Sequence, residues 1–272
     1  DPGALAAGAE RALGRGGPVY VSLVPTQLLW VLADPGAAAV LARASAVLVG
    51  GAAIDPALLA RSRAAGVRAV TTYGMSETGG GCVYDGVPLE GVSVRIEDPD
   101  EVGVGRIVLA GPVLAEGYVG PPGAPPPRSA RPVRSAFFRI GPRELATADR
   151  GRLDALPDGS TRLTVLGRLD DIIVTGGIKV DPRDVEQVLT GLPGVAQACV
   201  VGVPDRTWGS AVVAAVVPEA GATVDGEGLR RQARERLDGA HTPKRILVVP
   251  ELPLRGPGKT DRHTVAALCR AV

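Results

Sequence analysis

The feature that most constrains the fold is an alternation of short apolar runs with helical stretches over residues 18–72. Three apolar runs have the length of a strand: Pro18–Val24, Ala46–Val49 and Val67–Thr72. We expect helices between them, at about 26–43 and from Asp55-Pro56 to about Ala65, because proline suits the first helical turn. Apolar strands joined by helices are typical of a parallel sheet that is covered on both faces. The pattern predicts an α/β fold.

The pattern changes after residue 85, where the apolar runs become short and lose their helical partners. Three such runs follow: Val92–Ile96, Gly105–Ala110 and Leu163–Leu166. They predict a small antiparallel or barrel-like β subdomain over residues 85–167. Within it, Pro121–Pro132 is rich in proline and arginine, and we interpret it as a surface loop.

A second unit of mixed α and β character follows, so we place a domain boundary between 1–168 and 169–272. Asp181 is the expected N-cap of a helix over 182–189. The remaining expected elements are strands at 195–203, 211–217 and 245–249, and helices at 227–238 and 261–271.

Charge and cysteine content exclude several classes of function. The net charge of +1 gives no reason to expect binding to nucleic acid or to a membrane surface. No apolar run reaches the roughly 20 residues of a membrane helix. We expect no signal peptide, because Asp1-Pro2-Gly3 is not followed by a basic and then an apolar segment. The 3 cysteines are odd in number and widely spaced, which favours free thiols in a reducing cytoplasm. With only 2 histidines, histidine-based metal or triad chemistry is disfavoured.

Two glycine-containing segments follow consecutive predicted strands and are expected at one edge of the sheet. In Tyr73–Gly80, the Ser76 hydroxyl is suited to a phosphate oxygen, and the Glu77 carboxylate is a hard ligand suited to Mg²⁺. The ring of Tyr73 is suited to packing against a base. The other segment, Gly50-Gly51-Ala52, permits close approach of a flat ligand. Taken alone, Tyr73–Gly80 is equally compatible with a Gly-rich turn, and Gly50-Gly51 by itself favours a plain strand-to-helix turn.

Two further segments carry polar groups at a hairpin's spacing. Asp149 and Arg168 form a pair suited to a ribose diol, although each alone reads as a surface ion pair worth under about 1 kcal/mol. Gly176-Gly177 follows an apolar run and allows either a sharp turn or backbone contact with a narrow ligand.

Lysine is scarce in this chain, since Lys179, Lys244 and Lys259 are the only lysines among 30 basic residues. Lys259 lies in the loop Leu254–Thr260, which contains Gly256-Pro257-Gly258. A compact ammonium can approach a phosphate and a carboxylate together as a point charge, which a planar guanidinium does less well. Taken alone, a loop lysine of this kind favours the interpretation of a solvated surface cation, and only the other segments of the chain change that balance.

Taken in order, these segments resemble the acyl-adenylate-forming superfamily of acyl-CoA synthetases, nonribosomal adenylation domains and luciferases. The motifs that carry the resemblance are Val24-Pro25-Thr26, Gly50-Gly51-Ala52, Tyr73–Glu77, Thr147-Ala148-Asp149, Gly167–Asp171 with Thr175–Pro182, and Pro257-Gly258-Lys259. Within the superfamily, three segments look most like actinobacterial o-succinylbenzoate–CoA ligases of menaquinone biosynthesis: Leu23–Leu28, Val47–Ala52, and Thr72–Asp85 with its Cys82–Gly86.

The resemblance implies a role for each matching position. The cofactor-binding set would be Gly50, Gly51, Ala52, Tyr73, Gly74, Asp149, Arg168, Gly176 and Gly177. Of these, Gly50, Gly51 and Tyr73 would form the adenine pocket. Asp149 and Arg168 would grip the ribose, and Gly176-Gly177 would line the pantetheine tunnel. Ser76 would contact the α-phosphate, Glu77 would hold Mg²⁺, and Lys259 would bridge carboxylate and α-phosphate. Asp170 would be the hinge of a mobile C-terminal domain, residues 169–272.

The implied function is an ATP-dependent acid–CoA ligase that uses ATP, Mg²⁺ and CoA with a small carboxylic acid, with homodimer formation left open. Residues 1–168 would be an incomplete adenylate-binding domain, because the family's Ser/Thr/Gly-rich phosphate loop is not among these residues. The alternatives are another aryl- or acyl-CoA ligase, or a catalytically silent nucleotide-binding remnant.

Overall fold

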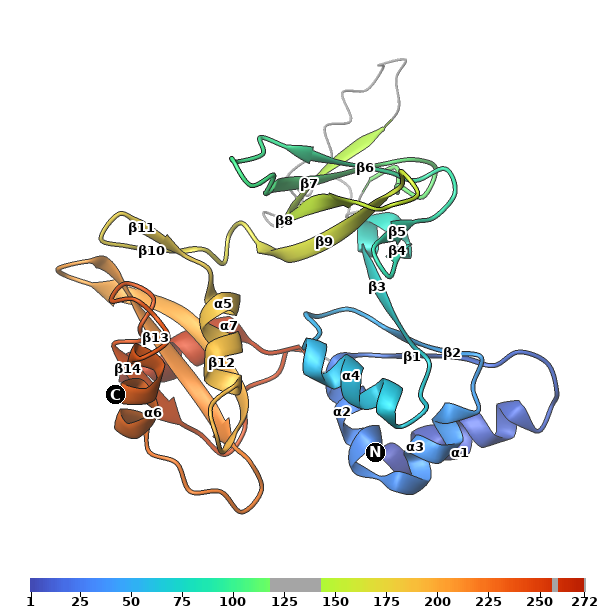
Figure 1. The fold of residues 1–272 in the computed structure, drawn as a ribbon, viewed down its shortest axis with the longest axis horizontal. Helices are drawn as coiled ribbons and strands as arrows, with labels where there is room; N and C mark the ends of the chain where they lie inside the picture. The colour runs from blue at the N-terminus through green and yellow to red at the C-terminus, as the bar shows by residue number, and fades with distance from the viewer. Residues whose placement is uncertain (118–142, 256–258, 272) are drawn as a thin grey trace, which may run out of the picture. The chain divides into compact units, whose positions relative to one another are not determined.

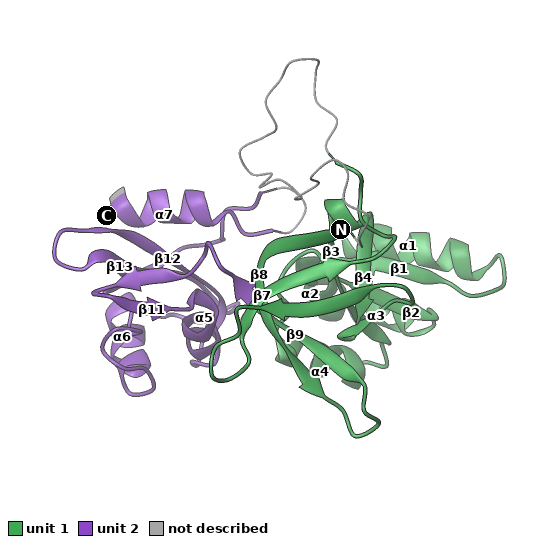
Figure 2. Cartoon of the chain, turned by 90° about the horizontal axis from the view of Figure 1, so that it is seen from above, with its two compact units in different colours: residues 1–166 green, residues 167–272 purple. Residues whose placement is uncertain are grey.

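The protein is described by a computed structural model, which covers residues 1–117, 143–255 and 259–271. The chain divides into two compact units, Asp1–Leu166 and Gly167–Val272, which Figure 2 colours separately. The expected surface loop Pro121–Pro132 lies outside the described residues. The mixed α/β class that the sequence predicts is confirmed in the elements of both units.

The first unit contains a five-stranded sheet with the strand order β1-β2-β3-β4-β5. Its strands are β1 Tyr20–Leu23, β2 Ala46–Val49, β3 Ala69–Met75, β4 Gly80–Tyr84 and β5 Val87–Pro88. The first three strands pair in parallel, as predicted. However, β4 and β5 add antiparallel strands, so the expectation of a purely parallel sheet is wrong at one side. The cause is a short 3₁₀ turn at Ser76–Thr78, after which Gly79 with φ 67° reverses the chain.

Four helices belong to this sheet's part of the chain: α1 Pro2–Leu13, α2 Pro25–Ala33, α3 Pro35–Ala42 and α4 Pro56–Ala64 (Figure 1). The single helix expected at about 26–43 is therefore wrong. The chain breaks at Asp34, whose carboxylate accepts hydrogen bonds from the N–H groups of Gly36 (2.9 Å) and Ala37 (3.0 Å) and so begins α3. Helix α1 was not predicted, although Asp1 caps it in the same way.

A second sheet of the first unit has the order β6-β7-β8-β9. Its strands are β6 Ser93–Glu97, β7 Gly105–Ala110, β8 Glu144–Ala155 and β9 Thr161–Arg168. The pairs β6–β7 and β7–β8 are antiparallel, as expected for this region. Cys82 and Val83 of β4 pack with Ile107 and Leu109 of β7, so the two sheets share one buried core. Strand β8 was missing from the predicted strands.

The second unit is built on a three-stranded sheet with the order β12-β13-β14. Its elements are the hairpin β10 Ile173–Thr175 and β11 Ile178–Val180, α5 Pro182–Thr190, β12 Val195–Asp205, β13 Gly209–Pro218, α6 Gly226–Arg234, β14 Arg245–Val248 and α7 Arg262–Ala271. Asp181 caps α5 as predicted, since it accepts from the N–H of Arg183 at 2.9 Å. The helix expected over 227–238 ends earlier, at Arg234.

Alternate residues of the β12–β13 pair are buried on opposite faces of its sheet. Val200, Val212 and Ala214 lie in a core with residues of α5 and α6. Cys199, Val201 and Val213 lie in another core with residues of α7. Figure 2 shows α7 on one side of these strands and α5 and α6 on the other. The period of two residues thus covers both faces of the sheet with helices.

No helix within the described part of the chain is long and apolar enough to cross a membrane.

We predict that Gly74→Ala destabilises the first unit by about 1–3 kcal/mol, because an added Cβ would press into the facing β4 strand. That Cβ would lie 2.8 Å from the Cα of Gly81 and against the carbonyl oxygen of Gly80. Urea denaturation followed by circular dichroism measures the change.

Gly8→Ala, inside α1 and with only a flexible Arg11 atom at 3.9 Å, is the matched control. It should be neutral or stabilising by under about 1 kcal/mol. Equal stability of the two variants would contradict the packing argument.

Candidate functional site

The glycine at the end of β2 is required by packing. Gly50 is buried, and its N–H donates to the carbonyl oxygen of Leu23 at 3.1 Å. A Cβ at Gly50 would collide with the Thr72 side chain and lie 2.9 Å from the Thr72 carbonyl oxygen. Gly51, with φ 80°, and Ala52 are exposed. The segment that follows β2 therefore exposes its backbone, with little side-chain volume, next to β3.

The predicted ligand loop at Tyr73–Gly80 is partly a strand, which corrects the sequence expectation. Tyr73, Gly74 and Met75 belong to β3, and only Ser76–Thr78 form the turn. The extension arises because β4 returns along β3 and pairs with its last residues. As a result, the position of Tyr73 is fixed by a sheet and not by a loop.

The structure brings two of the predicted site residues together. The phenol of Tyr73 donates a hydrogen bond to Oδ2 of Asp149 at 2.9 Å. Burial of Tyr73, and next the negative charge of Asp149, raise the pKa of the phenol well above its usual range. The phenol therefore remains protonated and keeps donating. This bond joins β3 of the first sheet to β8 of the second.

Asp149 is held in place by the buried Thr147 on the same strand. The Asp149 N–H donates to Oγ1 of Thr147 at 3.1 Å, and the Thr147 hydroxyl donates to the Ile107 carbonyl oxygen at 2.8 Å. Arg106 also donates to the Thr147 carbonyl oxygen at 2.9 Å. Thr147 belonged to the quoted motif, but its function as a support was not predicted.

The turn after β3 carries the two groups predicted to face phosphate and metal. Ser76 is exposed and Glu77 is half-buried. Thr78 is buried beneath them, accepts from the N–H of Met75 at 2.9 Å and donates to the Gly80 carbonyl oxygen at 2.6 Å. The N–H of Ala115 donates to the Glu77 carbonyl oxygen at 2.8 Å. The backbone of this turn is therefore firmly held while Ser76 faces solvent.

The other predicted residues belong to the second unit, and each is described there by itself. Arg168 and Asp170 form an exposed two-point ion pair, with Nε–Oδ1 at 3.1 Å and Nη2–Oδ2 at 2.8 Å. An exposed pair of this kind contributes under about 1 kcal/mol. The predicted ribose-binding arginine and the predicted hinge aspartate are thus each other's partners in this structure.

Gly176 and Gly177 form the turn of the β10–β11 hairpin with φ 56° and 82°. The Gly176 N–H donates to the Trp208 carbonyl oxygen at 2.9 Å, and a Cβ there would lie 2.8 Å from the Trp208 ring. Lys244 places its ammonium 5.3 Å from the centroid of the same ring. The sequence analysis assigned no function to Trp208 or Lys244, and the scarcity of lysine is the signal that could have found Lys244.

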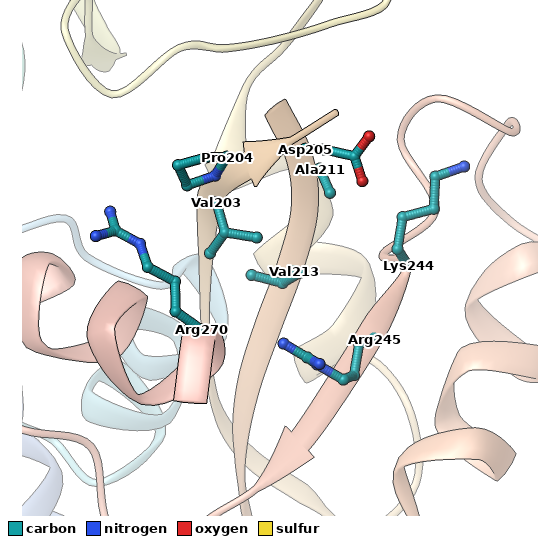
Figure 3. A pocket seen from close by; sticks show the side chains of 8 residues that line it. All are labelled: Val203, Pro204, Asp205, Ala211, Val213, Lys244, Arg245 and Arg270. Carbon is teal, nitrogen blue, oxygen red and sulfur yellow. The ribbon is translucent and has the colours of Figure 1, made fainter. Parts of the chain in front are cut away.

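Two hollows in the second unit meet at Lys244. A hollow of about 200 Å³ is lined by Thr175, Gly176, Ile178, Trp208, Gly239, Ala240 and Lys244. A larger one, of about 380 Å³, has a floor of Val203, Ala211 and Val213 and a rim that includes Lys244, Arg245 and Arg270 (Figure 3). Figure 3 shows Lys244 and Arg270 pointing away from each other, so the cations of the rim do not converge on one point.

Lys259 is exposed and comes directly before Thr260, one of the two residues that close the base of the loop. Leu254 and Thr260 form an isolated antiparallel bridge, and the Arg255 N–H donates to the Lys259 carbonyl oxygen at 2.6 Å. Pro257 and Gly258 lie outside the described residues. The described part of the loop therefore carries Lys259 at the surface of the second unit.

The three cysteines are free and buried, as the sequence predicted for the thiols. Burial raises the pKa of each thiol, that of Cys199 to about 12. Thiols in this state are poor nucleophiles. In the described ranges, no three side chains of His, Cys, Asp and Glu gather closely enough to hold a metal by themselves.

Comparisons with known proteins agree with this arrangement. The family of AMP-binding enzymes matches residues 6–119, and the AMP-binding enzyme C-terminal domain matches residues 184–259. A probable 2-succinylbenzoate–CoA ligase of Mycobacterium tuberculosis is 43% identical over 92% of this chain and 60% of that protein. A feruloyl-CoA synthase of Amycolatopsis sp. is 33% identical over 95% of this chain and 52% of that protein.

Among solved structures, o-succinylbenzoate CoA synthetase from Bacillus subtilis, in complex with its acyl-adenylate intermediate, matches with a TM-score of 0.72 and 26% identity. The match covers 96% of this chain and 53% of that protein. The chain thus spans between about half and 60% of the length of these relatives. The two family matches, the identity to these relatives and the shared fold lead to one conclusion: the chain belongs to the family of AMP-binding, adenylate-forming enzymes.

Proposed function

We propose that this protein is an ATP-dependent acid–CoA ligase that works through an acyl-adenylate, with o-succinylbenzoate as its acid and menaquinone biosynthesis as its pathway. The observation that carries the proposal is the Tyr73–Asp149 hydrogen bond of 2.9 Å beside the Ser76–Glu77 turn. It orients a carboxylate and an aromatic ring for a nucleoside at the end of β3. The 43% identity to a probable 2-succinylbenzoate–CoA ligase supports the choice of acid.

The chemistry has two steps. The acid's carboxylate attacks the α-phosphorus of ATP and pyrophosphate leaves; the CoA thiol then attacks the acyl carbonyl and AMP leaves. The first step brings two anions together, so positive charge must lie close to the reacting oxygens. Lys259 would supply such a charge, and Arg168 would help to hold the ribose. Gly176 and Gly177 would lie along the path of CoA, next to the hollow lined by Trp208.

Mg²⁺ would be held by Glu77 together with phosphate oxygens, and it would neutralise phosphate charge. The donors present fit this mode: Glu77 is a half-buried carboxylate on a held turn, and no cluster of three ligands occurs in the described residues. Magnesium in nucleotide sites is commonly held by one or two carboxylates plus the substrate's phosphates.

A second candidate acid class has its own support. The feruloyl-CoA synthase relative, at 33% identity over 95% of the chain, favours another aryl acid. Measuring AMP release with o-succinylbenzoate and with ferulate, each with CoA and ATP, separates the two. Turnover of ferulate alone would overturn the choice of o-succinylbenzoate while leaving the ligase proposal intact.

A cytoplasmic location forms part of the proposal, since the three buried free thiols suit a reducing compartment.

We predict that Tyr73→Phe weakens AMP binding about tenfold, because a hydrogen bond to a charged group is lost and Asp149 is no longer oriented. Titration calorimetry with AMP measures the dissociation constant. Tyr20→Phe removes a hydroxyl from a residue that is 65% exposed and serves as the matched control. An unchanged AMP affinity in Tyr73→Phe would contradict the assignment of this pair to the nucleotide.

Glu77→Gln should raise the Mg²⁺ concentration needed for half-maximal adenylate formation by about tenfold, because a neutral amide is a weaker ligand for a hard cation. Magnesium titrations of ATP–pyrophosphate exchange measure this shift. Glu90→Gln, at an exposed residue, is the control. A loss of rate with an unchanged magnesium midpoint would argue against Glu77 as the ligand.

Lys259→Ala should abolish adenylate formation yet spare thioester formation from a supplied acyl-adenylate, since the second step does not join two anions. Mass spectrometry of AMP and acyl-CoA follows the two half-reactions separately. Lys179→Ala, at another exposed lysine, is the matched control. Equal loss of both half-reactions in Lys259→Ala would overturn the role given to Lys259.

A further inference from the structure

A half-buried arginine at the start of α7 gathers three separate segments of the second unit. Arg262 forms an ion pair with Glu186 of α5, with Nη1–Oε1 at 2.8 Å, and a second hydrogen bond, Nη2–Oε2, at 3.0 Å. Its Nε lies 3.6 Å from Oδ2 of Asp171. Its Nη1 also donates to the Val200 carbonyl oxygen of β12 at 2.7 Å. One guanidinium thus joins α7 to α5, β12 and the segment before β10.

The ion pair also covers the free edge of the sheet at one residue, Val200. Strand β12 is the outer strand in the order β12-β13-β14, so the outward backbone groups of Val200 have no strand partner. The Val200 N–H donates to Oε1 of Glu186 at 2.8 Å, while its carbonyl oxygen accepts from Arg262. The two side chains together satisfy both groups, which is one way in which proteins protect a sheet edge.

Two acidic side chains compensate the positive charge of the half-buried Arg262. Its side chain is 30% exposed, and those of Glu186 and Asp171 are 18% and 31% exposed. Burial alone would lower the pKa of Arg262, but the charge and hydrogen bonds of Glu186 outweigh it and raise that pKa above its usual range. Arg262 therefore stays charged, and removing either partner would leave a charge poorly compensated.

The same residue stands at the base of the Lys259 loop. The Asp261 N–H donates to the Pro253 carbonyl oxygen at 2.8 Å, and Leu254 bridges to Thr260, so the loop's two ends are tied together. Asp261 accepts from the N–H groups of His263 (3.1 Å) and Thr264 (3.2 Å) at the start of α7. Arg262 comes next in the chain, so whatever fixes Arg262 also fixes the loop base.

We propose that Arg262 is a positioning residue for Lys259, acting together with Glu186. It anchors the loop base to α5 and β12 and thereby sets where the ammonium can reach. This inference rests on the proposed function only for the role of Lys259, because the anchoring follows from contacts within the second unit. Asp171 follows the predicted hinge residue Asp170, so the anchor and the start of the second unit share one ion network.

The geometry requires an arginine and not merely a cation. A guanidinium offers five N–H donors in a fixed fork, whereas an ammonium is a point charge with three. Arg262→Lys keeps the charge but cannot reach Glu186, Asp171 and the Val200 carbonyl oxygen together. Glu186→Gln is the second variant, because it keeps an acceptor for the Val200 N–H while removing the charge.

The first test is peptide-level hydrogen exchange on the intact chain, which needs no substrate. In Arg262→Lys, amides of residues 254–255 and 259–262 should exchange about tenfold faster, as expected when hydrogen bonds to a charged group are weakened. Amides in the β13 core should keep their rates. Glu186→Gln should act in the same direction. Arg230→Lys, which alters an exposed ion pair with Glu227, is the matched control and should change neither region.

The second test separates the two half-reactions. Arg262→Lys should slow adenylate formation about tenfold and leave thioester formation from a supplied acyl-adenylate unchanged. Equal slowing of both half-reactions, or exchange that accelerates uniformly or not at all, would overturn the inference. A third outcome is also distinguishable. If Lys259→Ala still forms the adenylate while Arg262→Lys still accelerates exchange in the loop, the role of Lys259 is overturned and the anchoring by Arg262 is retained.

Discussion

The hydrogen bond between Tyr73 and Asp149 is the interaction on which the candidate nucleotide site depends. It connects a residue of the first sheet to a residue of the second at 2.9 Å, and both sheets share the buried core around Ile107 and Leu109. Because the core fixes how the sheets meet, the separation between ring and carboxylate is set by apolar packing and not by the polar groups themselves. Thr147 then removes the remaining freedom of Asp149. Site geometry here is a consequence of how two sheets pack.

The second unit carries an exposed lysine, Lys259, beside a rigid sheet. Its sheet is buried on both faces, so its strands offer little freedom, and Lys259 is carried by a short loop at its margin. Arg262 and Glu186 place charge at the edge of the sheet, where the backbone groups of Val200 in the outer strand β12 have no strand partner. Rigidity of the support and exposure of Lys259 thereby coexist.

The sequence predicted the elements that follow simple periodicity, and failed where turn chemistry or distant pairing decides. The parallel strands, Asp181 as a cap and the alternating strands of the second unit could be read directly. The break at Asp34-Pro35 was signalled by its own residues and was overlooked. The antiparallel pairing of β4 with β3 could not be predicted from the sequence, because it depends on the turn at Ser76–Thr78. The Arg262–Glu186 pair lies 76 residues apart in sequence, and no local pattern announces it.

The glycines of the nucleotide motifs carry a consequence for how relatives are judged. A side chain at position 50 would collide with Thr72, and one at position 74 would collide with the backbone of Gly80 and Gly81. Both demands come from the apo fold, so they persist whether or not a nucleotide ever binds. A descendant that lost its chemistry would still be selected to keep these glycines and the Tyr73 ring, which packs against the shared core, while the exposed Ser76 would be free to change. The glycines therefore report ancestry, and an exposed position such as Ser76 reports retained use.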